Sequence, residues 1–216
     1  DFTVYKRSDL QAVSDNELNK PYDLLKKVSN WRRFYAVINA ASVFMEKAPR
    51  TVELDRSYSE QNLKYDIAQV RALRAFAYFY MVRIWGDVPL VTYSYDNGTF
   101  PSMPRTDAQT VLSYAKAELL TAIKDLPYQY GTQTNLYYGS YGAQWQGKLF
   151  NKLSAYSVLA HICAWQGNYA EAETYSAFII DHASEINAKY TSIADLTSET
   201  GLFYSNTSVK GSRILG

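Results

Sequence analysis

The sequence has few of the residues on which most catalytic and metal sites depend. It contains one cysteine, Cys163, and two histidines, His161 and His182, among 216 residues. A single cysteine cannot form a disulfide within the chain, and its apolar neighbours predict a small buried thiol. His161 lies next to it on a helix expected to be buried, where packing explains a histidine more simply than metal binding does. We therefore expect no metal site and no cofactor.

Sequence motifs of catalysis are also missing. There is no glycine-rich phosphate loop, no nucleophile elbow and no HExxH spacing. Carboxylates are plentiful, but two of them facing each other across a cleft are too unspecific a signal to predict a glycosidase. Asp87 follows Gly86 in an expected turn, where accepting backbone hydrogen bonds is its simpler role. We predict no catalytic residues and no enzyme activity.

The chain lacks an excess of either charge and lacks long apolar runs. Its 22 basic residues oppose 21 acidic ones, so the net charge is +1 and nucleic acid is not an expected partner. The basic pairs at 26–27 and 32–33 are interpreted as solvated helix faces. No apolar run approaches the roughly 20 residues that cross a bilayer, and no signal peptide opens the chain. Any membrane attachment is expected to lie outside this segment.

Aromatic residues, in contrast, are abundant. The sequence holds 20 Tyr, 9 Phe and 4 Trp, and many of the tyrosines fall in stretches with loop composition. Hydrophobic residues make up 47% of the chain, with only 6 Pro and 10 Gly, which indicates a folded chain. Loop tyrosines contribute little to a core, so they point to binding.

Apolar residues recur at spacings of three and four, which predicts an all-α fold. Helices are expected near 31–48, 60–85, 106–125, 148–165 and 169–183, while residues 1–30 and 184–216 are expected to be irregular flanking segments, the first with at most a short helix over 9–18. Long aromatic-rich loops should connect the helices at 88–104 and 128–146. The buried face of the helix over 60–85 is expected to carry the following residues: Leu63, Ile67, Val70, Ala77, Met81 and Ile84, with Leu73 and Tyr80 alongside.

Two segments fit the same helix–turn–helix template. The pair around Gly167 has the spacing of a tetratricopeptide unit, with Ala160 and Ala172 at the expected close approach. Placing Gly86 at the same turn position aligns the preceding helix with the template and makes residues 88–104 an insertion between two paired helices. Residues 31–183 are therefore predicted to form tetratricopeptide-like helical repeats, an α-α superhelix.

One stretch resembles a known family closely. Residues 71–91 read RALRAFAYFYMVRIWGDVPLV, and this sequence is similar to the signature helix and turn of SusD/RagB-like proteins. Supporting segments keep the family's order: WRRFYAVINAA at 31–41, PRT at 104–106 and the helix pair within 153–172. The resemblance implies that residues 1–216 are part of one SusD-like domain, without the lipidated cysteine or the large carboxy-terminal region.

The resemblance also implies a function. SusD/RagB-like proteins bind oligosaccharides or polysaccharides, starch-like or other, on the outer face of the outer membrane in Bacteroidetes, where a lipid anchor holds them. They deliver the glycan to a SusC-like TonB-dependent transporter, which is the expected partner. The open alternative from the repeats alone is a tetratricopeptide-type scaffold that binds peptides or partner proteins.

Candidate ligand-binding residues follow from the way proteins hold sugars. Aromatic rings stack against the C–H faces of a sugar, and amide side chains orient it. Trp31 stands at the start of an expected helix beside Asn30, so its ring either faces outward as a platform or wedges the helix start against a neighbour. Loop tyrosines complete the candidate set: Tyr93, Tyr95, Tyr137, Tyr138 and Tyr141.

Overall fold

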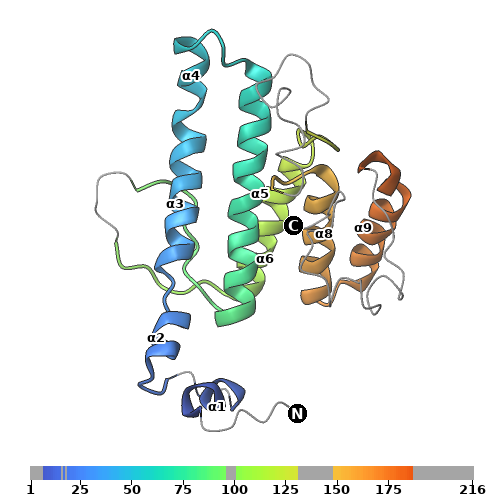
Figure 1. Ribbon diagram of the computed structural model, residues 1–216. Helices are drawn as coiled ribbons and strands as arrows, with labels where there is room; N and C mark the ends of the chain where they lie inside the picture. Colours follow the sequence, from blue (N-terminus) through green and yellow to red (C-terminus); the bar gives the residue numbers. More distant parts are fainter. Residues whose placement is uncertain (1–6, 16, 18, 96–100, 131–147, 187–216) are drawn as a thin grey trace, which may run out of the picture.

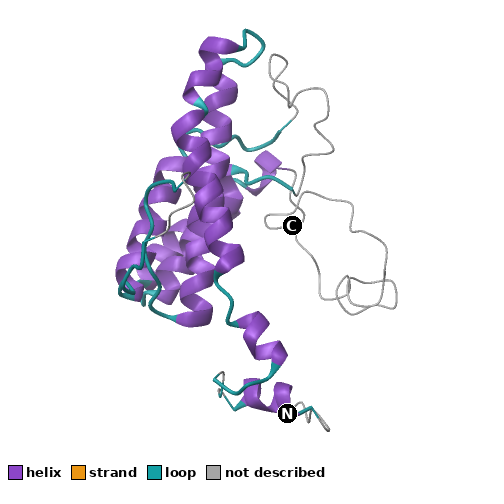
Figure 2. Ribbon diagram, turned by 90° about the vertical axis from the view of Figure 1, so that its left-hand side faces the viewer, coloured by secondary structure: helices purple, strands orange, loops and turns teal. Residues whose placement is uncertain are grey.

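The computed structural model describes residues 7–15, 17, 19–95, 101–130 and 148–186. The helices are α1 (Ser8–Ser14), α2 (Asp23–Val28), α3 (Arg32–Lys47), α4 (Pro49–Leu54), α5 (Glu60–Trp85), α6 (Ala108–Ala122), α8 (Lys152–Trp165), α9 (Tyr169–Asp181) and the 3₁₀ helix η2 (Ala183–Ile186). Within these ranges the only β pairing is an isolated bridge between Val88 and Thr106, and Figure 2 shows helices as the regular elements. The all-α prediction is confirmed.

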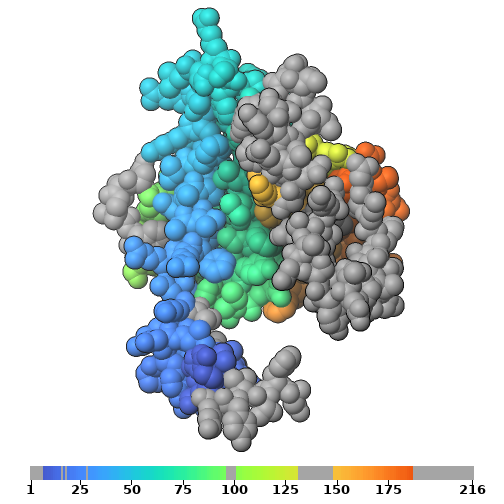
Figure 3. Space-filling view, viewed as in Figure 1, coloured from blue at the N-terminus to red at the C-terminus, as the bar shows by residue number. Residues whose placement is uncertain are grey.

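The helices stack side by side around α5. Figure 1 shows α3, α5, α8 and α9 in sequence across the molecule, with α6 behind α5. The central α5 packs against α3, α6 and α8, and α8 packs against α9. Two helix hairpins, α5/α6 and α8/α9, thus form the tetratricopeptide-like stack. Figure 3 shows α1 and α2 projecting from one end of this body.

Local capping explains where the helices begin. Ser59, Asp107, Asn151 and Asn168 each accept a hydrogen bond from a backbone N–H of the first turn that follows, which satisfies a group with no partner inside the helix. At α8, Asn151 and Ser154 cap each other in a capping box. The starts at Ala108 and Lys152 lie a few residues after the expected ones, because Asp107 and Asn151 are the caps.

Two glycines end the first helix of each hairpin, in different conformations. Gly167 has φ +80°, and hydrogen bonds from Gly167 N to Ala164 O (3.1 Å) and from Asn168 N to Cys163 O (2.8 Å) make a Schellman turn that leads straight into α9. Gly86 has φ +69° and ψ −120°, the mirror image of the extended region. The chain at Gly86 therefore leaves α5 outward, into a long loop.

The expected buried face of α5 is partly wrong. Leu73, Tyr80 and Ile84 are exposed, whereas Ala72, Ala75 and Tyr78 are among its most buried residues. A helix that packs against three neighbours buries more than one stripe, and small alanines let those neighbours approach. The side of α5 that carries Leu73, Tyr80 and Ile84 is the one left uncovered.

Other expectations need smaller corrections. His161 is exposed rather than packed inside, although Cys163 beside it is fully buried as expected. The segment before α3 contains two short helices, α1 and α2, where at most one was expected. Ala160 and Ala172 are half-buried. No helix in the described part of the chain is both long and apolar enough to span a membrane.

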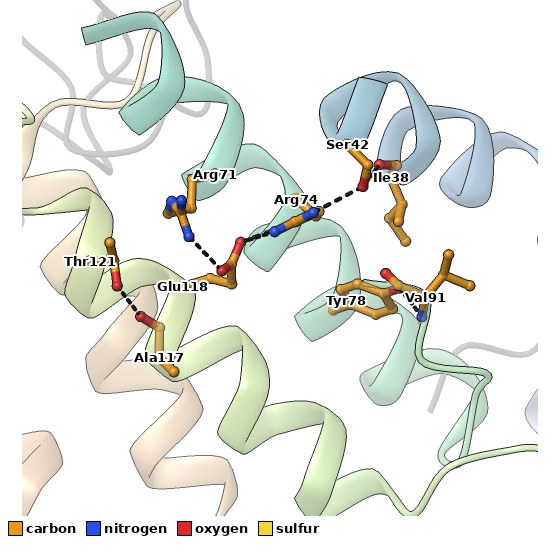
Figure 4. A network of polar contacts seen from close by, with 9 residues as sticks. All are labelled: Ile38, Ser42, Arg71, Arg74, Tyr78, Val91, Ala117, Glu118 and Thr121. Atoms are coloured by element: carbon orange, nitrogen blue, oxygen red, sulfur yellow. Dashed lines mark hydrogen bonds and ion pairs between the residues drawn. The ribbon is translucent and has the colours of Figure 1, made fainter. Parts of the chain in front are cut away.

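A buried ionic network joins α3, α5 and α6 (Figure 4). The Glu118 carboxylate accepts from Arg71 Nη1 at 2.8 Å and from Arg74 Nη2 at 2.5 Å, and Arg74 Nη1 donates to Ser42 Oγ at 2.9 Å. The Arg74 side chain is only 6% exposed. A buried charge is tolerated when it is paired and fully hydrogen-bonded, so this network fixes the relative positions of the three helices.

Candidate functional site

The loop between α5 and α6 is attached to the helices at many points. Its ends meet where Thr106 N donates to Val88 O at 3.0 Å. The Tyr78 hydroxyl of α5 donates to Val91 O and accepts from Val91 N, both at 2.8 Å, and the Tyr35 hydroxyl of α3 donates to Pro89 O at 2.7 Å. We call residues 88–95 and 101–106 the anchored loop, because side chains of the scaffold determine its path.

Polar side chains of α3 hold the tyrosines of the anchored loop. Asn39 accepts from Tyr95 N at 2.7 Å and donates to Tyr95 O at 2.9 Å, so one amide satisfies both backbone groups of that residue. Glu46 accepts from Ser94 N at 3.0 Å and from Ser94 Oγ. Tyr35, Asn39 and Glu46 are spaced by four and seven residues, which places them on one face of α3. That face carries the loop.

Tyr93 and Tyr95 form an aromatic pair on this support. Their ring centroids are 5.0 Å apart, and the Tyr95 hydroxyl donates to the Tyr93 hydroxyl at 2.7 Å. That hydrogen bond, with burial and the charge on Tyr93 adding to it, raises the pKa of Tyr95 to about 12. Tyr93 is 51% exposed while Tyr95 is half-buried, so the pair presents an aromatic surface that is held from the α3 side.

Trp31 lies in a separate aromatic cluster at the start of α3. Its ring centroid is 6.1 Å from that of Trp85 and 6.2 Å from that of Tyr35, and Phe34 meets Trp85 edge-on at 5.4 Å. The ring is half-buried against the core, as expected for a residue that wedges the helix start against its neighbour. Asn30 Oδ1 accepts from Arg32 N at 2.9 Å and so caps that helix.

The structure keeps the two groups of candidates apart along α3. Trp31 and Asn39, which holds Tyr95, are eight residues apart in sequence, a rise of about 12 Å along a helix. Both groups contact the anchored loop, Trp31 through Arg105 and Asn39 through Tyr95. Tyr137, Tyr138 and Tyr141 lie outside the described residues.

Two features near these aromatics could not be read from the sequence pattern. The Arg105 guanidinium of the anchored loop lies 5.0 Å above the Trp31 ring, although the two residues are far apart in the sequence. On the other side of the stack, Arg83 lies over Phe79, Tyr80 and Trp165 at 5.4–5.6 Å, with Trp165 53% exposed. The Arg105–Trp31 and Arg83–Trp165 contacts have no sequence signal, because each joins different elements of the fold, whereas Phe79 and Tyr80 precede Arg83 on the same helix at spacings of four and three.

Asp87 has the role expected of it. Its Oδ1 accepts from Ala108 N at 2.9 Å, at the first residue of α6, while Asp107 Oδ2 accepts from Thr110 N at 3.1 Å. These two carboxylates complete the start of α6. Both carboxylates thus take part in helix capping.

Comparison with curated proteins finds SusD-like relatives. SusD-like protein P38 of Formosa agariphila is 30% identical over 169 residues, which are 77% of this chain and 28% of that protein. A SusD-like protein of Bacteroides ovatus is 31% identical over 99 residues, or 46% of this chain and 18% of that protein. The chain therefore spans less than a third of the length of these relatives. No protein-family model matches the sequence.

Solved structures include a nearly identical chain. The crystal structure of a SusD superfamily protein from Bacteroides thetaiotaomicron is 99% identical, with a TM-score of 0.89, over 99% of this chain and 47% of that one. A laminarin-binding SusD-like protein is 27% identical with a TM-score of 0.55, over 67% of this chain and 28% of that protein.

Proposed function

Because the chain belongs to the SusD/RagB-like family, of whose length it carries only part, we propose that the protein containing it binds a glycan at the cell surface. Residues 1–216 then form part of one SusD-like domain, and the anchored loop contributes to the glycan site. The observation that carries this assignment is the Tyr93–Tyr95 pair, which is partly exposed and held by α3 through Asn39 and Glu46.

The physical reason lies in the cost of holding a neutral, hydrated ligand. Sugar hydroxyls are satisfied equally well by water, so affinity comes mainly from C–H faces that lie against aromatic rings and from rigid placement of those rings. Two hydrogen bonds to Asn39 fix the backbone of Tyr95, and contact with Tyr93 holds its ring. A preorganised aromatic pair with two hydroxyls suits the stacking and the orienting of a sugar.

The wider setting of this function follows from the family. The protein is proposed to be lipid-anchored on the outer face of the outer membrane, with the anchor outside this segment, and to deliver its glycan to a SusC-like TonB-dependent transporter. It is proposed to bind without catalysis and without a cofactor. The laminarin-binding relative supports a polysaccharide as the ligand class.

The alternative is a scaffold that binds peptides or partner proteins, and one observation favours it. The outer helix α9 has no fully buried residue, and Tyr169 and Ile180 on it are 72% and 59% exposed. Such a face can receive a further helical element, as in other repeat stacks. It lies on the far side of the stack from the anchored loop, so the two functions make different predictions.

A glycan array with the full-length protein identifies the ligand, and isothermal titration then compares variants. We expect Tyr93→Ala to weaken binding by at least about 1 kcal/mol, or roughly fivefold in Kd, because one aromatic contact is lost. The melting temperature should change little, since Tyr93 is half in solvent. Tyr169→Ala on α9 is the matched control and should bind normally.

Two results would contradict the proposal. One is an array on which no glycan binds the full-length protein. The other is a glycan that binds Tyr93→Ala and wild type equally but loses affinity in Tyr169→Ala, which would move the site to α9 and favour the scaffold.

A further inference from the structure

Arg105 is placed by an aromatic ring but has no acceptor. Its guanidinium lies 5.0 Å over Trp31, and among the described residues its side chain forms no hydrogen bond and no ion pair. Arg74 makes a similar contact, 5.6 Å over the Tyr114 ring, yet its nitrogens donate to Glu118 and Ser42. A guanidinium that lies over a ring keeps its N–H donors free in its own plane. Arg105 therefore presents an oriented set of donors to solvent.

A second arginine without an ion-pair partner lies on the helix face that carries the anchored loop. Arg32 is exposed, has no ion-pair partner in the described part of the chain, and shares the face of α3 that carries Tyr35 and Asn39 by helical spacing. The carboxylates of Asp87 and Asp107 keep their charge, but both accept backbone hydrogen bonds at the start of α6 and neither forms an ion pair with Arg105. Two arginines without ion-pair partners among the described residues thus belong to the anchored loop and to the helix face that carries it.

From this arrangement we infer that the glycan carries anionic groups, either carboxylates of uronic acids or sulfate esters, and that Arg105 binds one of them. This inference rests on the proposed function and specifies its ligand class. A carboxylate or sulfate accepts two parallel N–H bonds from a planar guanidinium, and the Trp31 ring supports the guanidinium of Arg105. Arg32 contributes long-range attraction, and the Tyr93–Tyr95 pair provides the apolar surface for the sugar rings.

Affinity electrophoresis of the full-length protein tests the inference. Native gels contain one of four polymers: polygalacturonate, dextran sulfate, and their neutral counterparts, fully methyl-esterified polygalacturonate and dextran. We expect at least one acidic polymer to retard the protein more than its neutral counterpart does, and added NaCl to reduce that retardation. Arg105→Gln should raise the Kd for that polymer at least about tenfold, the usual scale for a lost charged hydrogen bond.

Arg83→Gln is the matched control, because Arg83 also lies over aromatic rings and is exposed, but on α5 next to Trp165. It should bind the acidic polymer like the wild type, and circular dichroism should show both variants folded. The inference is overturned if neither acidic polymer retards the protein, if Arg105→Gln binds like the wild type, or if only Arg83→Gln loses binding. If a neutral polymer retards the protein in the same gels, the proposed glycan binding stands. If none of the four polymers retards it and no glycan on the array binds it, both the proposed function and the anionic ligand class are overturned.

Discussion

The two helix hairpins of this protein share a plan and differ in burial. In each, a helix ends at a glycine with positive φ and a second helix returns beside it. The central hairpin, α5/α6, buries charged side chains in the Arg71–Glu118–Arg74 network, whereas the outer hairpin, α8/α9, is joined to α6 by a partly exposed ion pair between Lys116 and Glu171 at 2.6 Å. The same local design has therefore been placed in two different environments.

The difference shows that position in the stack, more than helix sequence, determines what a hairpin can carry. The central hairpin has neighbours on both sides, α3 and α8, so its helices tolerate a long insertion without losing their packing. The outer hairpin has one neighbouring helix layer among the described residues, and its tight Schellman turn leaves no room for an insertion. The long loop is therefore found on the hairpin whose helices pack against neighbours on both sides.

The largest expected loss of stability follows from breaking the buried ion pair between Arg74 and Glu118. Glu118→Ala leaves the Arg74 guanidinium, 6% exposed, without its carboxylate, and breaking a buried pair in this way typically costs about 3–5 kcal/mol. Chemical denaturation of the full-length protein measures the loss. The double variant Arg74→Met/Glu118→Leu, which removes both charges, should regain most of it; equal losses in the single and double variants would show that an unpaired charge at Arg74 is not the cause of the loss.

A smaller effect should distinguish the two turn glycines. A Cβ added at Gly86 or Gly167 meets no neighbouring atom, so the stability lost on substitution by alanine comes from backbone strain alone. Gly167→Ala should cost about 1–2 kcal/mol, and Gly167→Asn less, because asparagine adopts the left-handed conformation readily. Gly86 lies in the mirror image of the extended region, so Gly86→Ala and Gly86→Asn should each lower the free energy of unfolding by up to about 3 kcal/mol. Thermal denaturation measures all four variants, and a well-tolerated Gly86→Asn would mean that the outward turn can be rebuilt.

The smallest expected effect concerns Glu171. The Lys116 ammonium, through a hydrogen bond and its charge, lowers the pKa of this carboxyl. A lowered pKa in the folded state contributes stability that is present above the unfolded pKa and is lost as the pH falls through the folded one. Because the Glu171 side chain is 35% exposed, Glu171→Gln should cost no more than about 1 kcal/mol at pH 7.

Denaturation curves at several pH values test this prediction. The difference between wild type and Glu171→Gln should shrink as the pH is lowered from about 4. Glu173→Gln, an exposed neighbour on the same helix, is the control and should show little difference at any pH. A difference that persists unchanged in acid would assign the stabilisation to neutral hydrogen bonding.

The fold could be predicted from the sequence largely because helix ends are local. Asp107 and Gly167 act within their own turns, so their sequence neighbours are enough to place the ends of α6 and α8. The burial of α5 could not be predicted the same way, since it depends on which helices pack against it. Leu73 and Tyr80 were assigned to a buried stripe that the three-sided packing of α5 does not use.

The candidate site could be predicted only in part, for a related reason. Tyr93 and Tyr95 stand out as loop tyrosines, but nothing local shows that Asn39 fixes one of them. The sequence did not decide whether the Trp31 ring faces outward or packs against a neighbouring helix. In the structure the ring lies against Trp85 and Tyr35. The Arg105–Trp31 contact joins a loop to a helix start, so only the tertiary structure reveals it.

The bridge between Val88 and Thr106 has a consequence for how such proteins diversify. Because the segment between them starts and finishes at the same spot on the scaffold, its length is nearly independent of the helices on either side. Closing a longer loop is inexpensive, about 0.6 kcal/mol for each doubling of its length. Under the proposed function, a protein with this scaffold can therefore change its ligand preference by replacing residues between Val88 and Thr106, while its helices stay the same.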